Sequence, residues 1–196
     1  PVFGMAPRFY RDAETWHVFF QLSAPDADRR IYHASSATLT DWTTPKEAWA
    51  QMQPGKRHID PAIAREGGRY YAGFKSGQQF YVMRSVGDAL DFRWETPVKA
   101  HTDGWCEAYQ FVKIDGQWHM MATGRAPQGF ETGGNGYTGS HEPYLYTMQG
   151  DGTELAHWAQ WTNKRHIPLP FSDWNRVMHA NSAYLCDWRD HDGWFY

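Results

Sequence analysis

The sequence has few cysteines, no long hydrophobic run and no excess of basic residues. Only two of its 196 residues are cysteines. No apolar stretch approaches the roughly 18 residues that a membrane-spanning helix needs. The 19 lysines and arginines are balanced by 22 acidic residues, which gives a formal net charge of −3. With no basic stripe and no apolar span, nucleic acid and membrane are not the expected partners.

The two cysteines are not expected to pair with each other. Cys106 lies near the start of one expected strand, whereas Cys186 comes seven residues after His179, toward the far end of the neighbouring strand. At about 3.3 Å per residue the offset between them is roughly 20 Å. Because this is too far for a disulfide, we expect two buried thiols, and cysteine usage leaves the redox compartment open.

A sustained helical period is also absent, and only residues 172–178 could form a short helical turn. Aromatic residues are plentiful instead, with 11 each of Trp, Tyr and Phe. Short aromatic-rich runs separated by Gly or acidic turns are typical of β-strands. Sugar rings stack on aromatic faces while acids and amides bond sugar hydroxyls, so carbohydrate fits this composition. We assign most of the aromatic residues to packing between sheets.

A hairpin-like unit occurs four times along the chain. Each copy has a short strand, a turn with acidic or Gly residues and an aromatic-rich return strand, and the copies begin at Ala6, Asp60, Glu107 and His179. The pair Asp115-Gly116 is a strong hairpin signal. A third strand and a Trp follow in three copies, and a fourth strand follows in two. Four-stranded units with a period of roughly 40–60 residues are typical of propeller blades.

The first residues of the four units should converge if the units stack around an axis. Ala6, Asp60, Glu107 and His179 are expected at the same position of the unit. Two carboxylates and an imidazole would then meet in one pocket, which suits acid–base chemistry. Each residue also has a simpler interpretation: Asp60 as a turn cap, Glu107 as a rim residue and His179 as a structural histidine.

The longest interval between units contains the Gly-rich segment 124–139. No strand–loop–helix context accompanies it, so we interpret it as a rim loop and not as a phosphate-binding loop. Three units and the beginning of another cannot close a ring, and an open sheet edge exposes unpaired backbone groups. We therefore expect the 196 residues to be part of a longer chain that supplies at least one more blade on the N-terminal side and the rest of the last blade.

The order of these motifs resembles glycoside hydrolase family 43, within the clan that also includes family 32. Met5-Ala6-Pro7 is similar to its second-blade motif, Ile59-Asp60-Pro61 to its third-blade motif, Glu107 to the Glu of its fourth blade and His179 to the His of its fifth. The resemblance implies an all-β fold, a five-bladed β-propeller of which this chain covers about three and a half blades. The blade-like units would be approximately 1–54, 55–102, 103–172 and an incomplete 173–196.

The resemblance also implies a function and roles for particular residues. It implies a glycosidase that cleaves an arabinofuranoside- or xyloside-type glycan with two carboxylates, and we expect an inverting reaction. Glu107 would be the general acid, Asp60 would orient it and modulate its pKa, and His179 would hold a metal ion directly or through water. No cofactor is required, although a structural Ca²⁺ near the axis is compatible with the family. The residues expected to contact sugar are His58, Lys75, Trp105, Tyr109 and Arg125.

Departures from the family pattern keep alternatives open. Glu107 is followed by Ala108-Tyr109 and not Gly-Pro, Met5 replaces the usual Trp, and the general base, a first-blade Asp in the family, has no counterpart. We expect the base outside this fragment. If it has been lost, the chain is a non-catalytic carbohydrate-binding or structural propeller.

Two further alternatives come from related propellers. Residues 16–21 are similar to a stretch of family 32, which would make the protein a retaining hydrolase. A phosphorylase is disfavoured because no basic cluster is present. We expect an extracellular or periplasmic location rather than a cytoplasmic one.

Overall fold

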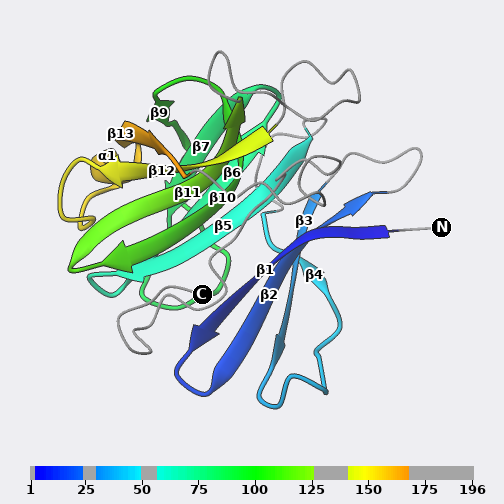
Figure 1. Ribbon diagram of the computed structural model, residues 1–196. Helices are drawn as coiled ribbons and strands as arrows, with labels where there is room; N and C mark the ends of the chain where they lie inside the picture. The colour runs from blue at the N-terminus through cyan, green and yellow to red at the C-terminus, as the bar shows by residue number, and fades with distance from the viewer. Residues whose placement is uncertain (1–2, 24–29, 50–56, 126–140, 168–196) are drawn as a thin grey trace, which may run out of the picture.

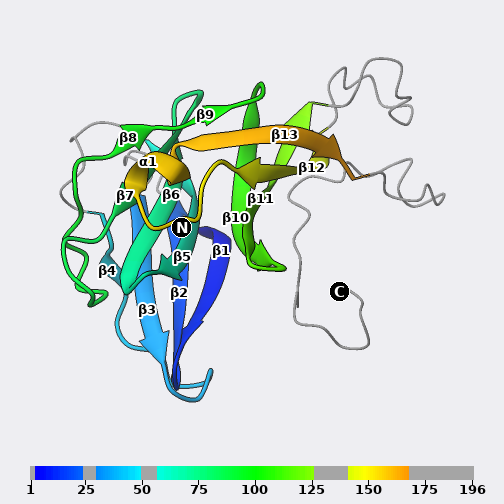
Figure 2. The ribbon, with the colours of Figure 1, turned by 90° about the vertical axis from the view of Figure 1, so that its left-hand side faces the viewer.

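The computed structural model describes residues 3–23, 30–49, 57–125 and 141–167. His179, Cys186, the segment 172–178 and the expected fourth unit lie outside this part. Three sheets follow one another along the described chain (Figures 1 and 2). The one described helix, α1 (Leu155–Trp158), is a single turn. The predicted all-β fold is therefore confirmed, and no described helix is long and apolar enough to span a membrane.

Each sheet has its strands in nearly the order of the chain. We number the sheets blades 1, 2 and 3 by their order in this chain, so blade 1 carries the motif likened above to the second blade of family 43. Blade 1 consists of β1 (Phe3–Asp12), β2 (Thr15–Ser23), β3 (Arg30–Ser36) and β4 (Lys46–Glu47). Blade 2 consists of β5 (His58–Glu66), β6 (Arg69–Ser76), β7 (Gln79–Arg84) and β8 (Val98–Lys99). Blade 3 consists of β10 (Cys106–Ile114), β11 (Gln117–Arg125), β12 (His141–Met148) and β13 (Gln160–His166), with β9 (His101–Thr102) parallel to β13 at its edge.

The hairpin turns lie where the sequence predicts them. β5 and β6 are joined by Gly67-Gly68, and β10 and β11 by Asp115-Gly116. All four residues have positive φ angles, between 49° and 79°. Two-residue hairpin loops need this left-handed backbone because it matches the twist of the flanking strands, and Gly and Asp tolerate it.

The first strand of every blade carries a bulge at the same place. The pairing register shifts between Met5 and Arg8 in β1, and at the corresponding positions of β5 and β10. Asp60 and Ala108 are the first residues of their bulges, with φ angles of 55° and 56°. Glu107 is the last paired residue before its bulge. The prediction that Asp60 and Glu107 occupy the same position of the unit is therefore wrong by one residue.

Two hydrophobic cores hold the blades together. The core between blades 1 and 2 is formed by side chains such as Phe19 and Ile31 against Phe74 and Met83. The larger core, between blades 2 and 3, is rich in aromatic residues, among them Tyr71, Phe80, Phe111, Trp118, Trp158 and Trp161. The faces of Tyr71 and Trp158 stack with ring centroids 4.4 Å apart. Most of the aromatic residues named here are therefore packing residues, as the sequence analysis expected.

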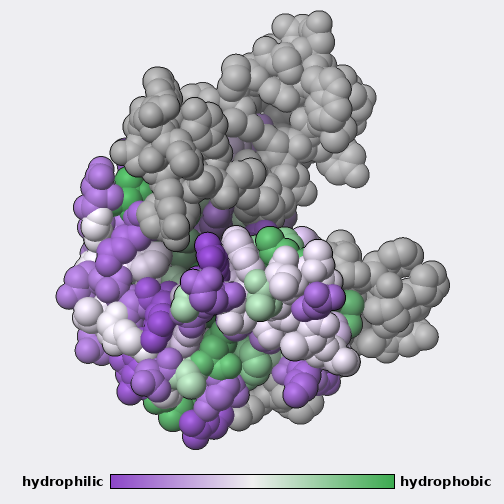
Figure 3. All heavy atoms as spheres, turned by 90° about the horizontal axis from the view of Figure 1, so that it is seen from below, coloured by the Kyte–Doolittle hydropathy of each residue, from purple (hydrophilic) through white to green (hydrophobic). Residues whose placement is uncertain are grey.

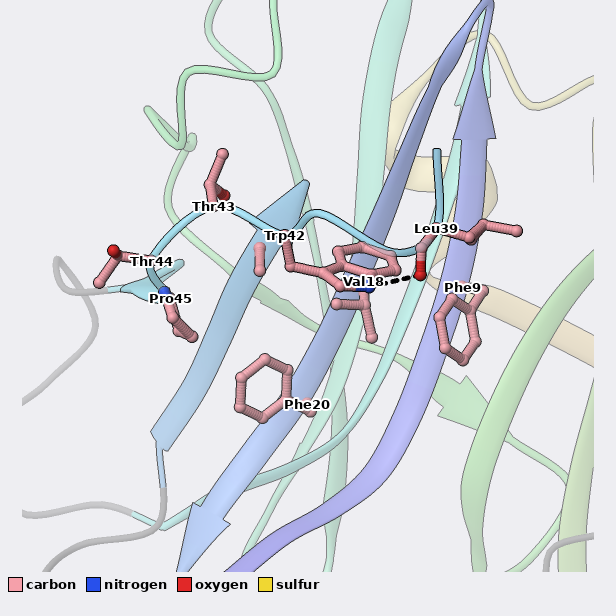
Figure 4. A pocket seen from close by; sticks show the side chains of 9 residues that line it. Phe9, Val18, Phe20, Leu39, Trp42, Thr43, Thr44 and Pro45 are labelled. Atoms are coloured by element: carbon pink, nitrogen blue, oxygen red, sulfur yellow. Dashed lines mark hydrogen bonds between the residues drawn. The ribbon is translucent and has the colours of Figure 1, made fainter. Parts of the chain in front are cut away.

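One face of blade 1 carries an aromatic groove. It has a volume of about 650 Å³, and Phe9, Phe20 and Trp42 are among its lining residues (Figure 4). Strand register makes Phe9 and Phe20 equivalent to Ile63 and Phe74, which pack against blade 1. The same face of blade 2 is thus covered by its preceding blade, whereas no other described blade covers this face of blade 1.

The described residues on the face seen from below are mostly polar (Figure 3). Seen from below, hydrophobic residues form small groups among polar ones (Figure 3). Among the described large hydrophobic residues, Phe9, Leu39 and Val86 are the exposed ones. The Trp42 indole N–H donates to the Leu39 carbonyl at 2.9 Å, which fixes Trp42 at the mouth of the groove. Because the groove lies on the face away from blade 2, it is separate from the point where the first strands meet.

Candidate active site

The first strands of the three blades come together at their N-terminal ends. β5 lies between β1 and β10 and contacts both (Figure 1). A hydrogen bond from the Arg8 side chain of β1 to the Tyr109 carbonyl of β10 also links the outer two strands. The three bulges therefore surround one region, and the structure brings Asp60 and Glu107 into it.

Asp60 is buried at the centre of this region. Only 8 % of the residue is exposed, and its Oδ2 accepts a hydrogen bond from the Ala108 backbone N–H at 3.2 Å. Burial raises the pKa of the Asp60 carboxyl, and the charge of Glu107 raises it further. The bond from Ala108 and the positive charges of Lys75 and Arg8 oppose this rise. The carboxyl of Asp60 is thus held among charges of both signs.

Glu107 is paired with a buried cation. Its carboxylate accepts a hydrogen bond from the Lys75 ammonium, and the Lys75 side chain is 7 % exposed against 20 % for Glu107. The same ammonium lies 4.9 Å from the ring centroid of Trp105, within cation–π range. The Trp105 indole N–H donates to Gln78 at 2.8 Å. Glu107, Lys75 and Trp105 therefore form a connected group beside Asp60.

Two of the other predicted sugar contacts have packing roles. His58 is buried, and its ring packs against the Phe74 ring in a T-shaped arrangement with the ring centroids 5.2 Å apart. Tyr109 is fully buried: its phenol donates to the Cys106 carbonyl at 2.8 Å and its ring stacks on Phe80 at 3.9 Å. A side chain with no exposed surface cannot touch a sugar, so packing replaces the predicted sugar contact of Tyr109.

The side chains of two further predicted residues lie outside the described part of the structure. Arg125 closes β11, and only its backbone position is described. His179 lies beyond residue 167, where the described part ends. Their predicted roles, a sugar contact and a metal ligand, stay predictions.

The structure adds Arg8, which the sequence analysis did not select. Its Nε donates to the Tyr109 carbonyl at 2.9 Å, its Nη1 donates to the Pro7 carbonyl at 3.0 Å, and the residue is 8 % exposed. Strand register places Arg8 where the other blades have Ala62 and Gln110. The sequence did carry a signal for Arg8, because the equivalent residues of the other two blades are uncharged.

The described residues do not form a site for Ca²⁺. No group of three or more His, Cys, Asp or Glu side chains among them could hold a metal ion. Calcium needs six to eight oxygen ligands, whereas the two central carboxylates already face Arg8 and Lys75. The structural Ca²⁺ near the axis stays a prediction.

No protein-family model matches the chain. No curated protein sequence matches it either.

Solved structures do resemble it. A GH43 protein from a Bacteroides ovatus xyloglucan utilisation locus has a TM-score of 0.55 at 16 % identity, over 85 % of this chain and 29 % of its own. The catalytic domain of a Coprinopsis cinerea GH62 α-L-arabinofuranosidase has a TM-score of 0.56 at 9 % identity, over 83 % of this chain and 50 % of its own. A family 117 glycoside hydrolase of the marine bacterium Zobellia galactanivorans has a TM-score of 0.59 at 15 % identity, over 91 % of this chain and 57 % of its own.

These similarities establish the fold. The chain has a family 43-like fold, that of the five-bladed β-propellers, and the described residues form three of its blades. It spans less than two thirds of the length of each of these three structures. The predicted fold class and the resemblance on which it rested are confirmed.

Proposed function

We propose that this chain is part of a glycosidase that acts on an arabinofuranoside- or xyloside-type glycan. One observation carries the proposal: Asp60 holds the N–H of the residue directly after Glu107. Two acids are thereby fixed on neighbouring first strands at the region where the blades converge. A glycosidase needs a carboxylic acid to protonate the departing oxygen and a second carboxylate on the other side of the scissile bond, and Glu107 is proposed as the first of these. The fold similarity supports the same class of reaction, since the neighbours named above include glycoside hydrolases.

In this proposal Glu107 is the general acid. It gives its proton to the oxygen of the departing sugar while water attacks the anomeric carbon from the opposite side. Asp60 fixes the backbone after Glu107 through the Ala108 N–H and places a negative charge beside it. The base that activates the water belongs to a part of the protein outside the described blades. This arrangement would invert the anomeric configuration.

Lys75 and Trp105 support the reaction in different ways. The Lys75 ammonium already contacts Glu107, so it is placed to stabilise the carboxylate that remains after proton donation. Trp105 is half-buried beside it and offers an aromatic face to a sugar ring. Together with Arg125, these residues are the proposed lining of the sugar site.

A carbohydrate-binding propeller without turnover is the second candidate. The ion pair between Lys75 and Glu107 favours it, because a carboxylate satisfied by a buried ammonium has the form of a structural pair. Both candidates place the sugar at the same end of the blades, so binding alone does not separate them.

The test is hydrolysis by the complete protein, with binding measured in parallel. Arabinan, arabinoxylan and xylo-oligosaccharides are incubated with the wild type and Glu107→Gln, and released sugars are quantified by chromatography. The proposal expects wild-type hydrolysis and a loss of at least about 100-fold in the variant, with binding retained. Glu14→Gln, in the turn of blade 1 with its side chain 93 % exposed, is the matched control and should be unchanged. Binding without hydrolysis in the wild type would instead favour the second candidate.

A further inference from the structure

The bulge of β10 is held from two other blades. Its first residue, Ala108, donates its backbone N–H to Asp60 of blade 2 at 3.2 Å. Its second residue, Tyr109, accepts a hydrogen bond at its backbone carbonyl from Arg8 of blade 1 at 2.9 Å. Three blades therefore meet at this two-residue bulge, and Glu107 is the residue that immediately precedes it.

Arg8 is well suited to hold this bulge rigidly. The residue is buried, and its Nη1 makes a second hydrogen bond, to the Pro7 carbonyl at 3.0 Å, so that Nε and Nη1 both donate to backbone carbonyls. The contact spans 101 residues of sequence and skips blade 2. A planar guanidinium donates in fixed directions, which a flexible ammonium does not.

We propose that Arg8 is a positioning residue of the site: it fixes the β10 bulge from across the blades and thereby sets the direction of Glu107. The inference rests on the proposed role of Glu107 for its catalytic consequence only. The geometric part, that Arg8 controls the backbone of Ala108 and Tyr109, holds whatever the reaction is.

Arg8 also contributes positive charge beside Asp60. The charged and titratable groups that face Asp60 are Arg8, Lys75, Glu107 and the phenol of Tyr109. Removing the charge of Arg8 disfavours the Asp60 carboxylate, so the pKa of Asp60 should rise. Charge and geometry can be separated because Arg8→Lys keeps the charge and loses the planar fork, whereas Arg8→Gln loses both.

The geometric part is tested by backbone hydrogen exchange of the complete protein, read by NMR. Both Arg8→Lys and Arg8→Gln should speed exchange at the Ala108 amide by about 10-fold or more, while the slowest amides of β6 and β11 keep their rates. Arg11→Gln, on the same strand but with a partly exposed side chain, should leave the exchange rates of the Ala108 amide and of the slowest amides unchanged. An unchanged Ala108 amide in both variants overturns the proposal, as does equal acceleration at every amide. If Arg8→Gln does not fold, Arg8→Lys gives the same comparison.

The charge and the catalytic consequence are read separately. In a ¹³C-carboxyl titration the Asp60 signal should move to higher pH in Arg8→Gln and stay in place in Arg8→Lys. On a natural glycoside both variants should lose kcat by about 10-fold with little change in KM. Altered exchange at Ala108 with unchanged kcat would overturn the catalytic part alone. Absence of any glycosidase activity in the wild type would refute the proposed function and leave the geometric result standing.

Discussion

The Asp60 carboxylate and the Ala108 backbone N–H, 48 residues apart in sequence, are joined by a 3.2 Å hydrogen bond between blades 2 and 3. Asp60 makes this bond from a backbone with a φ of 55°. Both features favour Asp or Asn, which adopt positive φ more easily than other non-Gly residues and carry an acceptor, whereas Ala has no side-chain acceptor.

Replacement of Asp60 should therefore depend strongly on the new residue. Asp60→Ala loses the acceptor, leaves a buried N–H unpaired and strains the backbone, so we expect a loss of about 1–3 kcal/mol in the free energy of unfolding. Asp60→Asn keeps both features and should remain within about 1 kcal/mol of the wild type. Urea unfolding of the three proteins measures the difference. Equal losses in both variants would show that the bond to Ala108 contributes nothing.

The wild type and Asp60→Asn should also differ in how their stability depends on pH. The folded state raises the pKa of Asp60, mainly by burial. The folded protein therefore keeps a proton that the unfolded chain releases near pH 4. The stability that Asp60 contributes is full below that pH and is lost as the pH rises through the folded-state pKa. Relative to Asp60→Asn, the wild type should lose stability from about pH 4 upward, and parallel curves would contradict this prediction.

The histidine pair of blade 1 should make the stability change with pH in the opposite direction. His17 Nδ1 and His33 Nε2 are 2.8 Å apart, and burial, with a smaller contribution from His17, lowers the pKa of His33 to about 4. In the unfolded chain His33 takes up a proton near pH 6.5. The stability that neutral His33 contributes to the folded state is therefore full above pH 6.5 and is lost as the pH falls toward 4. The loss is at most roughly 3 kcal/mol. His33→Gln should flatten the curve, whereas the exposed control His101→Gln should leave it unchanged.

Much of the fold was predictable because its signals are local. Gly67-Gly68 and Asp115-Gly116 mark the hairpin turns, and the aromatic runs mark the strands that the structure contains. The one-residue offset between Asp60 and Glu107 was not predictable in this way. It depends on where each first strand bulges, and a bulge is recognised by its pairing with the next strand.

The site was predictable in part. The structure brings Glu107 near Asp60, and Lys75 and Trp105 lie with Glu107. The roles predicted for these residues stay predictions. Tyr109 was misread because sequence shows an aromatic residue beside an acid but not the Phe80 ring that covers it. Arg8 was missed because its partner lies 101 residues away in another blade.

The contact between blades 2 and 3 should depend on Gly73. A Cβ at this position would lie 2.8 Å from both Phe111 and Phe80, which belong to the core between the two blades. Gly73→Ala should therefore destabilise the protein by about 1–3 kcal/mol through overpacking. Gly87→Ala, where the nearest atom is 4.0 Å away, is the control and should have little effect. Thermal or urea unfolding measures both, and equal stabilities would contradict the tight packing of the two blades.

The most direct test of the central claim is the leaving-group dependence of Glu107→Gln in the complete protein. Gln keeps the shape of Glu107 and can accept a hydrogen bond from Lys75, but it has no acidic proton to transfer to the leaving group. Turnover of a natural glycoside should fall by at least about 100-fold. Turnover of an aryl glycoside with a good leaving group should fall much less, because that oxygen departs with little protonation. An equal loss on both substrates, or no loss on either, would contradict the assignment of Glu107 as the general acid.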